Sequence, residues 1–293
     1  MHRDTEADPP PLPTAAELAA VVDLLADGQA VVAAAARARV LRWGDHALPA
    51  VRAAAEAGDA RLRARCRSLL RSLEVRDCLV RLSRLRLAAA GRGSPTTLLV
   101  GAALLSRMAR TFVPTDGELI AGLREHARAV AARADGRSLP YAARALAERL
   151  HGHAGWRGSL GGTAPVEHVA IDGVLATGTG APVALSLLCL VVARWAGFSA
   201  AGVAMPGHFL VRLHGVRPVL VDPFHGGRVV TKLDCMRLLR RAGHRPVAPL
   251  VRDLGDRSVL RAYLDCLRAA VAQRPLEHAS QALEHAAALL AGA

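Results

Sequence analysis

The spacing of apolar residues predicts helices along the first half of the chain. Thr14 followed by Glu17 has the form of a capping box ahead of an apolar run, so we expect a helix to begin there. Within residues 47–73 the apolar side chains recur every three or four positions on both sides of Gly58-Asp59, which predicts a helix, a break and a second helix. The helices expected in this half are residues 15–25, 28–43, 47–73 with its break, 75–90, 98–112, 116–134 and 139–151.

The pattern changes after a Gly-rich stretch at residues 152–166, which carries Trp156 and is either a domain boundary or a loop over a site. An apolar helix is expected at residues 182–196, with Pro182 in its first turn, where the missing N–H of proline is no loss. Three β-like runs follow it, and helical periodicity then returns. The strands expected are 201–205, 208–213 and 219–222, and the later helices are 232–241, 256–273 and 277–291.

These elements predict an α+β fold, in which a helix packs on a small antiparallel sheet between helical flanks. The expected segments are a disordered Pro-rich tail (1–13), a helical region (14–92), the core with its helical lead-in (93–247) and a C-terminal helical hairpin (248–293). The helix pair within residues 47–73 resembles a HEAT-type repeat. Two antiparallel helices of an ordinary α domain would give the same pattern, so both interpretations stay open.

Composition narrows the functional classes. The chain has 293 residues, is 52% hydrophobic and carries a net charge of +13, yet Lys occurs once (Lys232) and Asn is absent. Arg therefore replaces Lys as the main basic residue, as in proteins from GC-rich bacterial genomes. Because genome composition accounts for much of the Arg excess, we do not expect specific nucleic-acid binding. No uninterrupted apolar run reaches the roughly 18–20 residues of a membrane span, and the N-terminal stretch lacks the apolar region of a signal peptide. A cytoplasmic protein is expected.

The five cysteines do not form a recognisable framework. They are an odd number without a CxxC pair, which favours reduced thiols over disulfides or a zinc site. His151-Gly-His153 is the nearest approach to a pair of metal ligands, but nothing nearby completes a site. We therefore expect no metal and no cofactor.

The segment with the most chemical information is the hairpin formed by residues 208–213 and 219–222. With a turn centred on Gly215, His208 and Asp222 would be direct cross-strand neighbours, with Cβ atoms roughly 4.5–5.5 Å apart. Asp222 could then accept a hydrogen bond from the imidazole and orient it, as in a nucleophile–His–Asp site. A slip of one residue would place the two side chains on opposite faces.

At residues 178–227 the sequence resembles the transglutaminase-like superfamily, in particular its bacterial SirB-type branch. The resemblance rests on several fixed strings in one order over about fifty residues. The matching residues are Gly180, Pro182, Leu185-Ser186, Leu188, Ala193, Gly197, Gly202-Val203, Pro206-Gly207-His208-Phe209-Leu210-Val211-Arg212, Asp222-Pro223-Phe224 and Gly226-Gly227. Residues 98–177 resemble the helical lead-in of that branch more loosely, and residues 256–273 its following helix, which in relatives often begins TPR-like hairpins.

The resemblance implies a papain-like core in which a Cys at the start of the core helix attacks an acyl carbon, a His acts as base and an Asp orients it. His208 and Asp222 match the family His and Asp. The nucleophile position is occupied by Pro182, which cannot attack, and this replacement is usual in the SirB-type branch. Gly180, Arg212 and Phe224 are the expected binding residues.

Two other residues of the core helix are candidate nucleophiles. Cys189 lies seven residues beyond Pro182, about 10.5 Å of helix rise, and away from the helix N-terminus that would lower a thiol pKa, so it fits a buried core position. Ser186 lies one turn into the helix and would reach the site if it faced the sheet; otherwise its hydroxyl bonds its own helix backbone. Cys235 opens a later helix, where family nucleophiles do not sit.

Several roles remain open for the polar residues of the hairpin. His208 either binds a ligand or peptide, forms a purely structural pair with Asp222, or retains catalysis. Arg212 shares its strand face and either binds a carboxylate or is solvated at the strand end. His214 and His225 are expected at the surface.

The expected function is therefore a non-catalytic protein-interaction or regulatory module that binds a protein or peptide. The alternative is a cysteine or serine acyl-transfer enzyme that uses His208 and Asp222 with a relocated nucleophile. The retained dyad motivates the alternative, and Pro182 favours the first interpretation.

Overall fold

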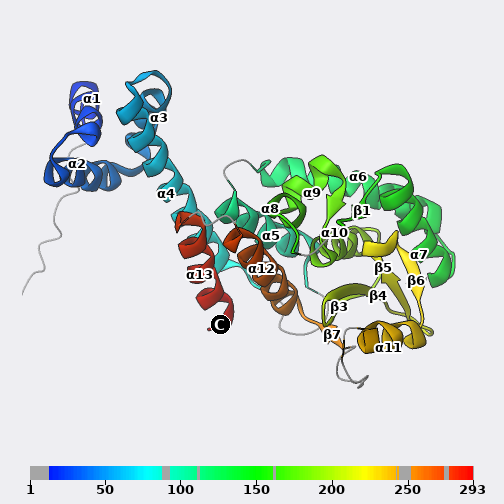
Figure 1. Ribbon diagram of the computed structural model, residues 1–293. Coiled ribbons are helices and arrows are strands. Elements are labelled where there is room, and N and C mark those ends of the chain that lie inside the picture. The colour runs from blue at the N-terminus through cyan, green and yellow to red at the C-terminus, as the bar shows by residue number, and fades with distance from the viewer. Residues whose placement is uncertain are drawn as a thin grey trace, which may run out of the picture. The chain divides into compact units, whose positions relative to one another are not determined.

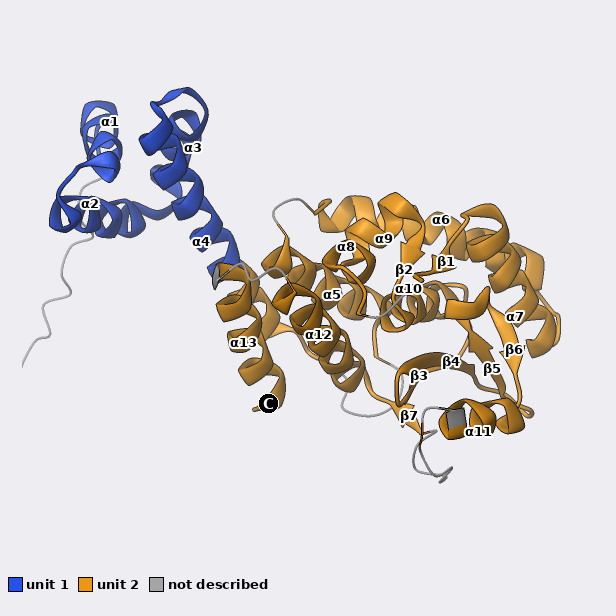
Figure 2. Cartoon of the chain, in the orientation of Figure 1, with its two compact units in different colours: residues 1–77 blue, residues 78–293 orange. Residues whose placement is uncertain are grey.

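A computed structural model of the chain describes residues 13–87, 93–110, 113–160, 163–241, 243, 252–273 and 277–292. The expected disordered tail lies outside the described residues apart from Pro13, as do the ends of the predicted helices 75–90 and 98–112 and the start of segment 248–293. The chain divides into two compact units, residues 1–77 and residues 78–293 (Figure 2). The division falls within a single helix, α4 (Ala60–Arg84).

Unit 1 is helical. It contains α1 (Ala15–Asp23), α2 (Ala30–Trp43), α3 (Leu48–Ala57) and the first part of α4. The predicted capping box is present, since Thr14 accepts from the Glu17 N–H and the Glu17 side chain accepts from the Thr14 N–H. The helices enclose a small apolar core of Val22, Leu25, Ala36, Val40, Ala47, Val51, Ala55, Leu62, Cys66 and Leu69.

The expected separation of a helix ending at residue 73 from one beginning at residue 75 is wrong. Helix α4 continues unbroken from Ala60 to Arg84. Residues 73–76 contain no Gly or Pro, so nothing in the sequence interrupts the backbone hydrogen bonds there. The predicted break at Gly58-Asp59 is present between α3 and α4.

Unit 2 places a five-stranded antiparallel sheet among helices (Figure 1). The sheet order is β6-β5-β4-β3-β7, and a separate parallel pair joins β1 to β2. The strands are β1 (Arg157–Gly158), β2 (Thr179–Gly180), β3 (Ala200–Met205), β4 (His208–Leu213), β5 (Val219–Asp222), β6 (Arg228–Val230) and β7 (Asp253–Leu254). The helices are α5 (Pro95–Ala109), α6 (Asp116–Ala134), α7 (Leu139–Ala147), α8 (Val166–Val169), α9 (Ile171–Thr177), α10 (Pro182–Trp195), α11 (Lys232–Arg241), α12 (Asp256–Ala272) and α13 (Glu277–Ala291).

The core helix α10 lies at the centre of unit 2. Its residues from Val183 to Ala193 are all buried, and it packs against β4 as well as α5 and α6. Helix α11 covers the opposite face of the sheet, where Val203 and Leu210 pack against Cys235. This arrangement confirms the α+β class and the prediction of a helix on a small antiparallel sheet.

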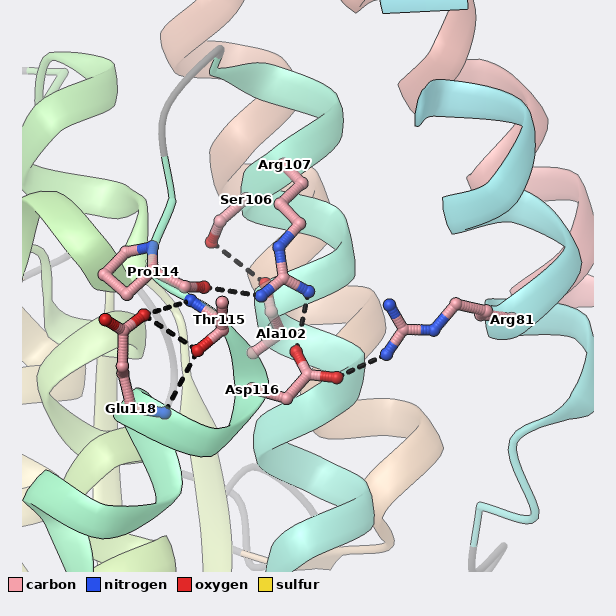
Figure 3. Close-up of polar contacts among 8 residues, drawn as sticks. All are labelled: Arg81, Ala102, Ser106, Arg107, Pro114, Thr115, Asp116 and Glu118. Carbon is pink, nitrogen blue, oxygen red and sulfur yellow. Dashed lines mark hydrogen bonds and ion pairs between the residues drawn. The ribbon is translucent and has the colours of Figure 1, made fainter. Parts of the chain in front are cut away.

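Polar contacts fix the helical lead-in to the core. Helix α6 opens with a second capping box, in which Thr115 and Glu118 satisfy each other's backbone N–H groups. Asp116 in the same turn binds Arg107 of α5 at 2.7 Å and also Arg81 of α4 (Figure 3). The guanidinium groups of Arg107 and Arg81 outweigh the effect of burial and lower the pKa of Asp116.

Candidate functional site

His208 and Asp222 meet, although not in the predicted register. Val211 pairs with Val221 and Leu213 with Val219, so the hairpin is centred on residue 216 and not on Gly215. Pro218 has no N–H to extend the ladder, which leaves residues 214–218 as the loop. The predicted direct pairing is therefore wrong, and the two residues are diagonal neighbours. Because the diagonal preserves the strand face, His208 Nε2 still lies 2.9 Å from Asp222 Oδ1.

Asp222 joins two imidazoles. Its side chain has no exposed surface, and its Oδ2 also lies 2.7 Å from His225 Nδ1. The His225 N–H donates to Oδ1 at 3.2 Å, and Arg228 Nε lies 3.5 Å from Oδ2. Burial alone would raise the pKa of Asp222, but the hydrogen bonds and positive charge from His208 and His225 lower it to about 2.

Sequence analysis missed the role of His225, which it placed at the surface. The imidazole is partly exposed, yet it belongs to the same hydrogen-bonded group as His208, with the two ring centroids 5.3 Å apart. The short turn Pro223–His225 brings His225 back to the carboxylate three residues earlier, because Asp222 caps that turn. A search for a capping Asp ahead of Pro and His would have found it.

The hydrogen bond to Asp222 fixes how His208 can act. When the ionised carboxylate accepts from Nε2–H, the neutral imidazole carries its lone pair on Nδ1. Among the described residues no group hydrogen-bonds to Nδ1. Phe224 packs edge-on against the ring, with centroids 5.8 Å apart. His208 therefore has one anchored nitrogen and one available for a ligand or a proton.

His208 opens into a cavity of about 310 Å³ that brings segments far apart in the sequence together. The Gly-rich stretch 152–166 contributes one wall, which favours the loop-over-a-site interpretation of that stretch. The remaining walls come from the start of α10, the β3–β4 turn, the turn after β5, and α12. The lining residues are Ser159, Thr163, Ala164, Val169, Ala181, Pro182, Gly207, His208, Phe224, Cys266 and Ala269.

Pro182 and His208 both line this cavity, so the position where the family resemblance expects a nucleophile and the expected base belong to one site. The other candidate nucleophiles are held elsewhere. Cys189 is buried, and desolvation raises its pKa to about 12. Ser186 is fully buried, and its hydroxyl donates to the Phe209 carbonyl of β4 at 2.9 Å and not to its own helix. Burial likewise raises the pKa of Cys235.

Cys266 of α12 is the thiol that does line the cavity, and sequence analysis did not select it. It is partly exposed, and burial first and Asp265 second raise its pKa. A protonated thiol is a weak nucleophile, so this environment does not activate Cys266.

The expected binding residues lie at different places. Phe224 lines the cavity, whereas the Arg212 guanidinium binds the carboxylate of Asp253 on β7, which His214 also contacts at 3.0 Å. Gly180 allows close packing and has no side chain to bind a ligand, because a Cβ there would lie 2.9 Å from the Leu185 side chain. Its strand partner Gly158 has the same role, since a Cβ would lie 2.6 Å from the Phe224 carbonyl oxygen.

One group of the described residues has the composition of a metal site. Ligand atoms of His208, Asp222 and His225 all lie within 4.8 Å of one another. Both imidazoles direct a nitrogen at the carboxylate at hydrogen-bonding distance, and Arg228 adds a positive charge beside it. These contacts describe a hydrogen-bonded triad; to hold a cation, both imidazoles would have to exchange their N–H donors for metal bonds.

None of the helices that the structure describes is long and apolar enough to cross a membrane.

Comparison with known proteins finds relatives that match a short part of the chain. Two relatives called UPF0162 protein, from two strains of Xylella fastidiosa, are 47% identical over 64 residues and 46% identical over 63 residues. The chain spans about a fifth of the length of each relative. The first match covers 22% of this chain and 22% of the relative, and the second covers 21% of each. A crystal structure of menin, described by its binding site for the Mixed Lineage Leukemia protein, covers 75% of this chain and 61% of menin at 9% identity, and its TM-score of 0.38 is too low to indicate a shared fold.

The match to a family is broader. It extends from residue 117 to residue 263, half of the chain, and it includes α10, the sheet, Asp222 and the cavity residues Pro182 and His208. The chain belongs to the transglutaminase-like superfamily.

Proposed function

We propose that this chain is a non-catalytic member of the superfamily that binds a protein or peptide partner at the cavity beside His208. The observation that carries the proposal is Pro182, which lines that cavity where the resemblance to the family expects the nucleophilic Cys. Proline has no group that could attack a carbonyl carbon. The site thus keeps a positioned imidazole and an apolar pocket, and both suit binding.

The surroundings of the other thiols support this proposal. Cys189 is buried within α10 and its pKa is raised to about 12, so almost no thiolate forms near neutral pH. Cys266 reaches the cavity, but its pKa is also raised. Ser186 uses its hydroxyl to bind the Phe209 carbonyl.

We also propose that the chain belongs to the SirB-type branch, on the strength of the PGHFLVR and DPF strings and of Pro182. The helices of unit 1 are proposed to form a HEAT-like flank. Their helix-break-helix pattern at Gly58-Asp59 supports this interpretation.

A second candidate function is acyl transfer with a relocated nucleophile. The 2.9 Å contact between His208 and Asp222 favours it, because that pair is the base and its orienting carboxylate in active relatives. Under this alternative one cysteine or serine would react in a manner that depends on His208.

Covalent labelling separates the two functions. The full chain is treated with iodoacetamide or a peptide vinyl sulfone at neutral pH, and adducts are mapped by mass spectrometry. Non-catalytic binding predicts slow labelling of Cys266 at a rate that His208→Ala does not change. Fast labelling of Cys189 that His208→Ala abolishes would overturn the proposal. His214→Ala is the matched control, since His214 contacts Asp253 and does not line the cavity.

A further inference from the structure

The start of helix α10 presents unpaired hydrogen-bond donors at the cavity wall formed by Ala181 and Pro182. The first helical hydrogen bond runs from the Leu185 N–H to the Ala181 carbonyl at 3.1 Å. No side chain caps the helix, and Pro182 has no N–H. Among the described residues nothing accepts from the Val183 or Ala184 N–H. Two free amides therefore stand at the positive end of a 14-residue helix.

Ser159 adds an independent donor. The residue is only 8% exposed and lines the cavity, and its backbone N–H is used by the Gly180 carbonyl. Its hydroxyl has no partner among the residues that the structure describes. A hydroxyl that lines a cavity can hydrogen-bond to a ligand or a water there. This side chain thus indicates that a polar group of a ligand belongs here.

His208 lines the same cavity. Its side chain is 9% exposed, Nε2 is held by Asp222, and Nδ1 has no partner among the described residues. Nδ1 is therefore available to a ligand in the cavity.

The rest of the cavity is apolar or neutral. Val169, Phe224 and Ala269 form walls, and none of the described lining residues is acidic. The pocket is therefore suited to a ligand with one anionic group and an apolar body.

We propose that this cavity binds a carboxylate attached to an apolar group, with the carboxylate at the α10 N-terminus beside Ser159. The inference rests on the proposed function and names its ligand chemistry. In an active relative this end of the helix would face a thiolate, and Pro182 leaves its positive potential available to the ligand. The carboxylate belongs either to a partner peptide or to a free small acid.

The test compares acids with their neutral amides. The ¹⁵N-labelled full chain is titrated with 3-phenylpropionate or 3-phenylpropanamide, and with N-acetylphenylalanine or its amide as a mimic of a peptide C-terminus. NMR shifts of Ser159, Val183 and Ala184 report occupancy. At neutral pH each acid is expected to bind about tenfold more tightly than its amide, because the free amides of the helix N-terminus favour an anion. The acid that binds more tightly identifies the source of the carboxylate.

Variants keep the result specific to the site. Ser159→Ala should weaken acid binding several-fold and leave amide binding unchanged, and His214→Gln should change neither. Equal binding of acid and amide, or no binding of either, would overturn the inference and leave the proposed function standing. Conversion of N-acetylphenylalaninamide to its acid would instead overturn the proposed function.

Discussion

At the residue scale, Asp222 accounts for most of the order in the site. It is buried, it is ionised, and it accepts from His208, from the His225 ring and from the His225 backbone. A buried carboxylate is tolerated only when its hydrogen bonds and charge are satisfied. The two imidazoles therefore stabilise the buried Asp222 carboxylate, and the carboxylate in turn orients both rings.

Truncating the two members of the pair should have unequal effects on stability. Asp222→Ala leaves the imidazoles and the His225 N–H without their acceptor, so we expect a loss of ~2–3 kcal/mol in the free energy of unfolding. His208→Ala should cost ~1 kcal/mol or less, because Asp222 keeps His225 and the cavity admits water. Urea unfolding measures both, with Asp265→Ala as an exposed-carboxylate control. Equal losses would contradict this account of the pair.

Asp222 also makes stability depend on pH. Its pKa of about 2 lies below the ordinary aspartate value of 3.8, so its contribution is complete above the unfolded value and is lost as the pH falls through 3.8 towards 2. This lowering of the pKa corresponds to ~2 kcal/mol in the free energy of unfolding. Unfolding free energies of the wild type and Asp222→Asn should therefore converge between about pH 5 and 2. A constant gap over this range would contradict the lowered pKa.

Sequence reasoning at this scale found His208 and Asp222 but not their geometry. Strand alternation places them on one face in either of two registers that differ by an even step, so the contact was predictable although the turn centre was not. The contacts of Ser186 with Phe209 and of Arg212 with Asp253 depend on tertiary packing, and no local pattern encodes them.

At the scale of elements, long helices were predictable because their ends carry local signals. The predicted bounds of residues 116–134 match α6, whose start is a capping box and whose end precedes Asp135-Gly136. The two-residue strands β1, β2 and β7 were missed. Segments this short have no periodicity, and their pairing depends on partners distant in the sequence.

Helix α10 is attached to the sheet through Ser186, whose hydroxyl donates to the Phe209 carbonyl of β4. Ser186→Ala should lower the free energy of unfolding by ~1 kcal/mol and should leave carboxylate binding unchanged, because Ser186 does not line the cavity. Thermal or urea unfolding measures the first effect and the NMR titration the second. Ser83→Ala is the control, since that exposed hydroxyl bonds only the Val80 carbonyl within its own helix. Loss of ligand binding in Ser186→Ala would indicate a direct role in the site.

At the scale of the whole molecule, the division at Asp77 and Cys78 bears on where the core unit begins. The prediction of a helical region 14–92 and a core 93–247 rests on a change in pattern near Gly91 and stays a prediction. The sequence pattern does not reveal contacts between distant residues, such as the ion pair of Arg81 with Asp116, which connects the end of α4 to the core unit.

Two fragments test the boundary. The fragment 78–293 retains Arg81 and the buried Leu82, whereas 93–293 loses both. We expect 78–293 to be more stable by ~2–4 kcal/mol, mainly because of the apolar surface that Leu82 and its neighbours bury. Thermal unfolding of the two fragments provides the comparison. Indistinguishable stabilities would place the start of the core unit at residue 93.

The most direct test of the account is to return a thiol to the start of α10. Pro182→Cys is made in a Cys266→Ser background, and alkylation by iodoacetamide at neutral pH is followed by mass spectrometry. If Pro182 alone separates this site from a reactive one, the introduced thiol should react about tenfold faster than an ordinary cysteine, because the helix N-terminus and His208 favour its thiolate. Adding His208→Ala should remove that advantage. An introduced thiol that reacts no faster than Cys266 does in the wild type, with or without His208, would contradict the account.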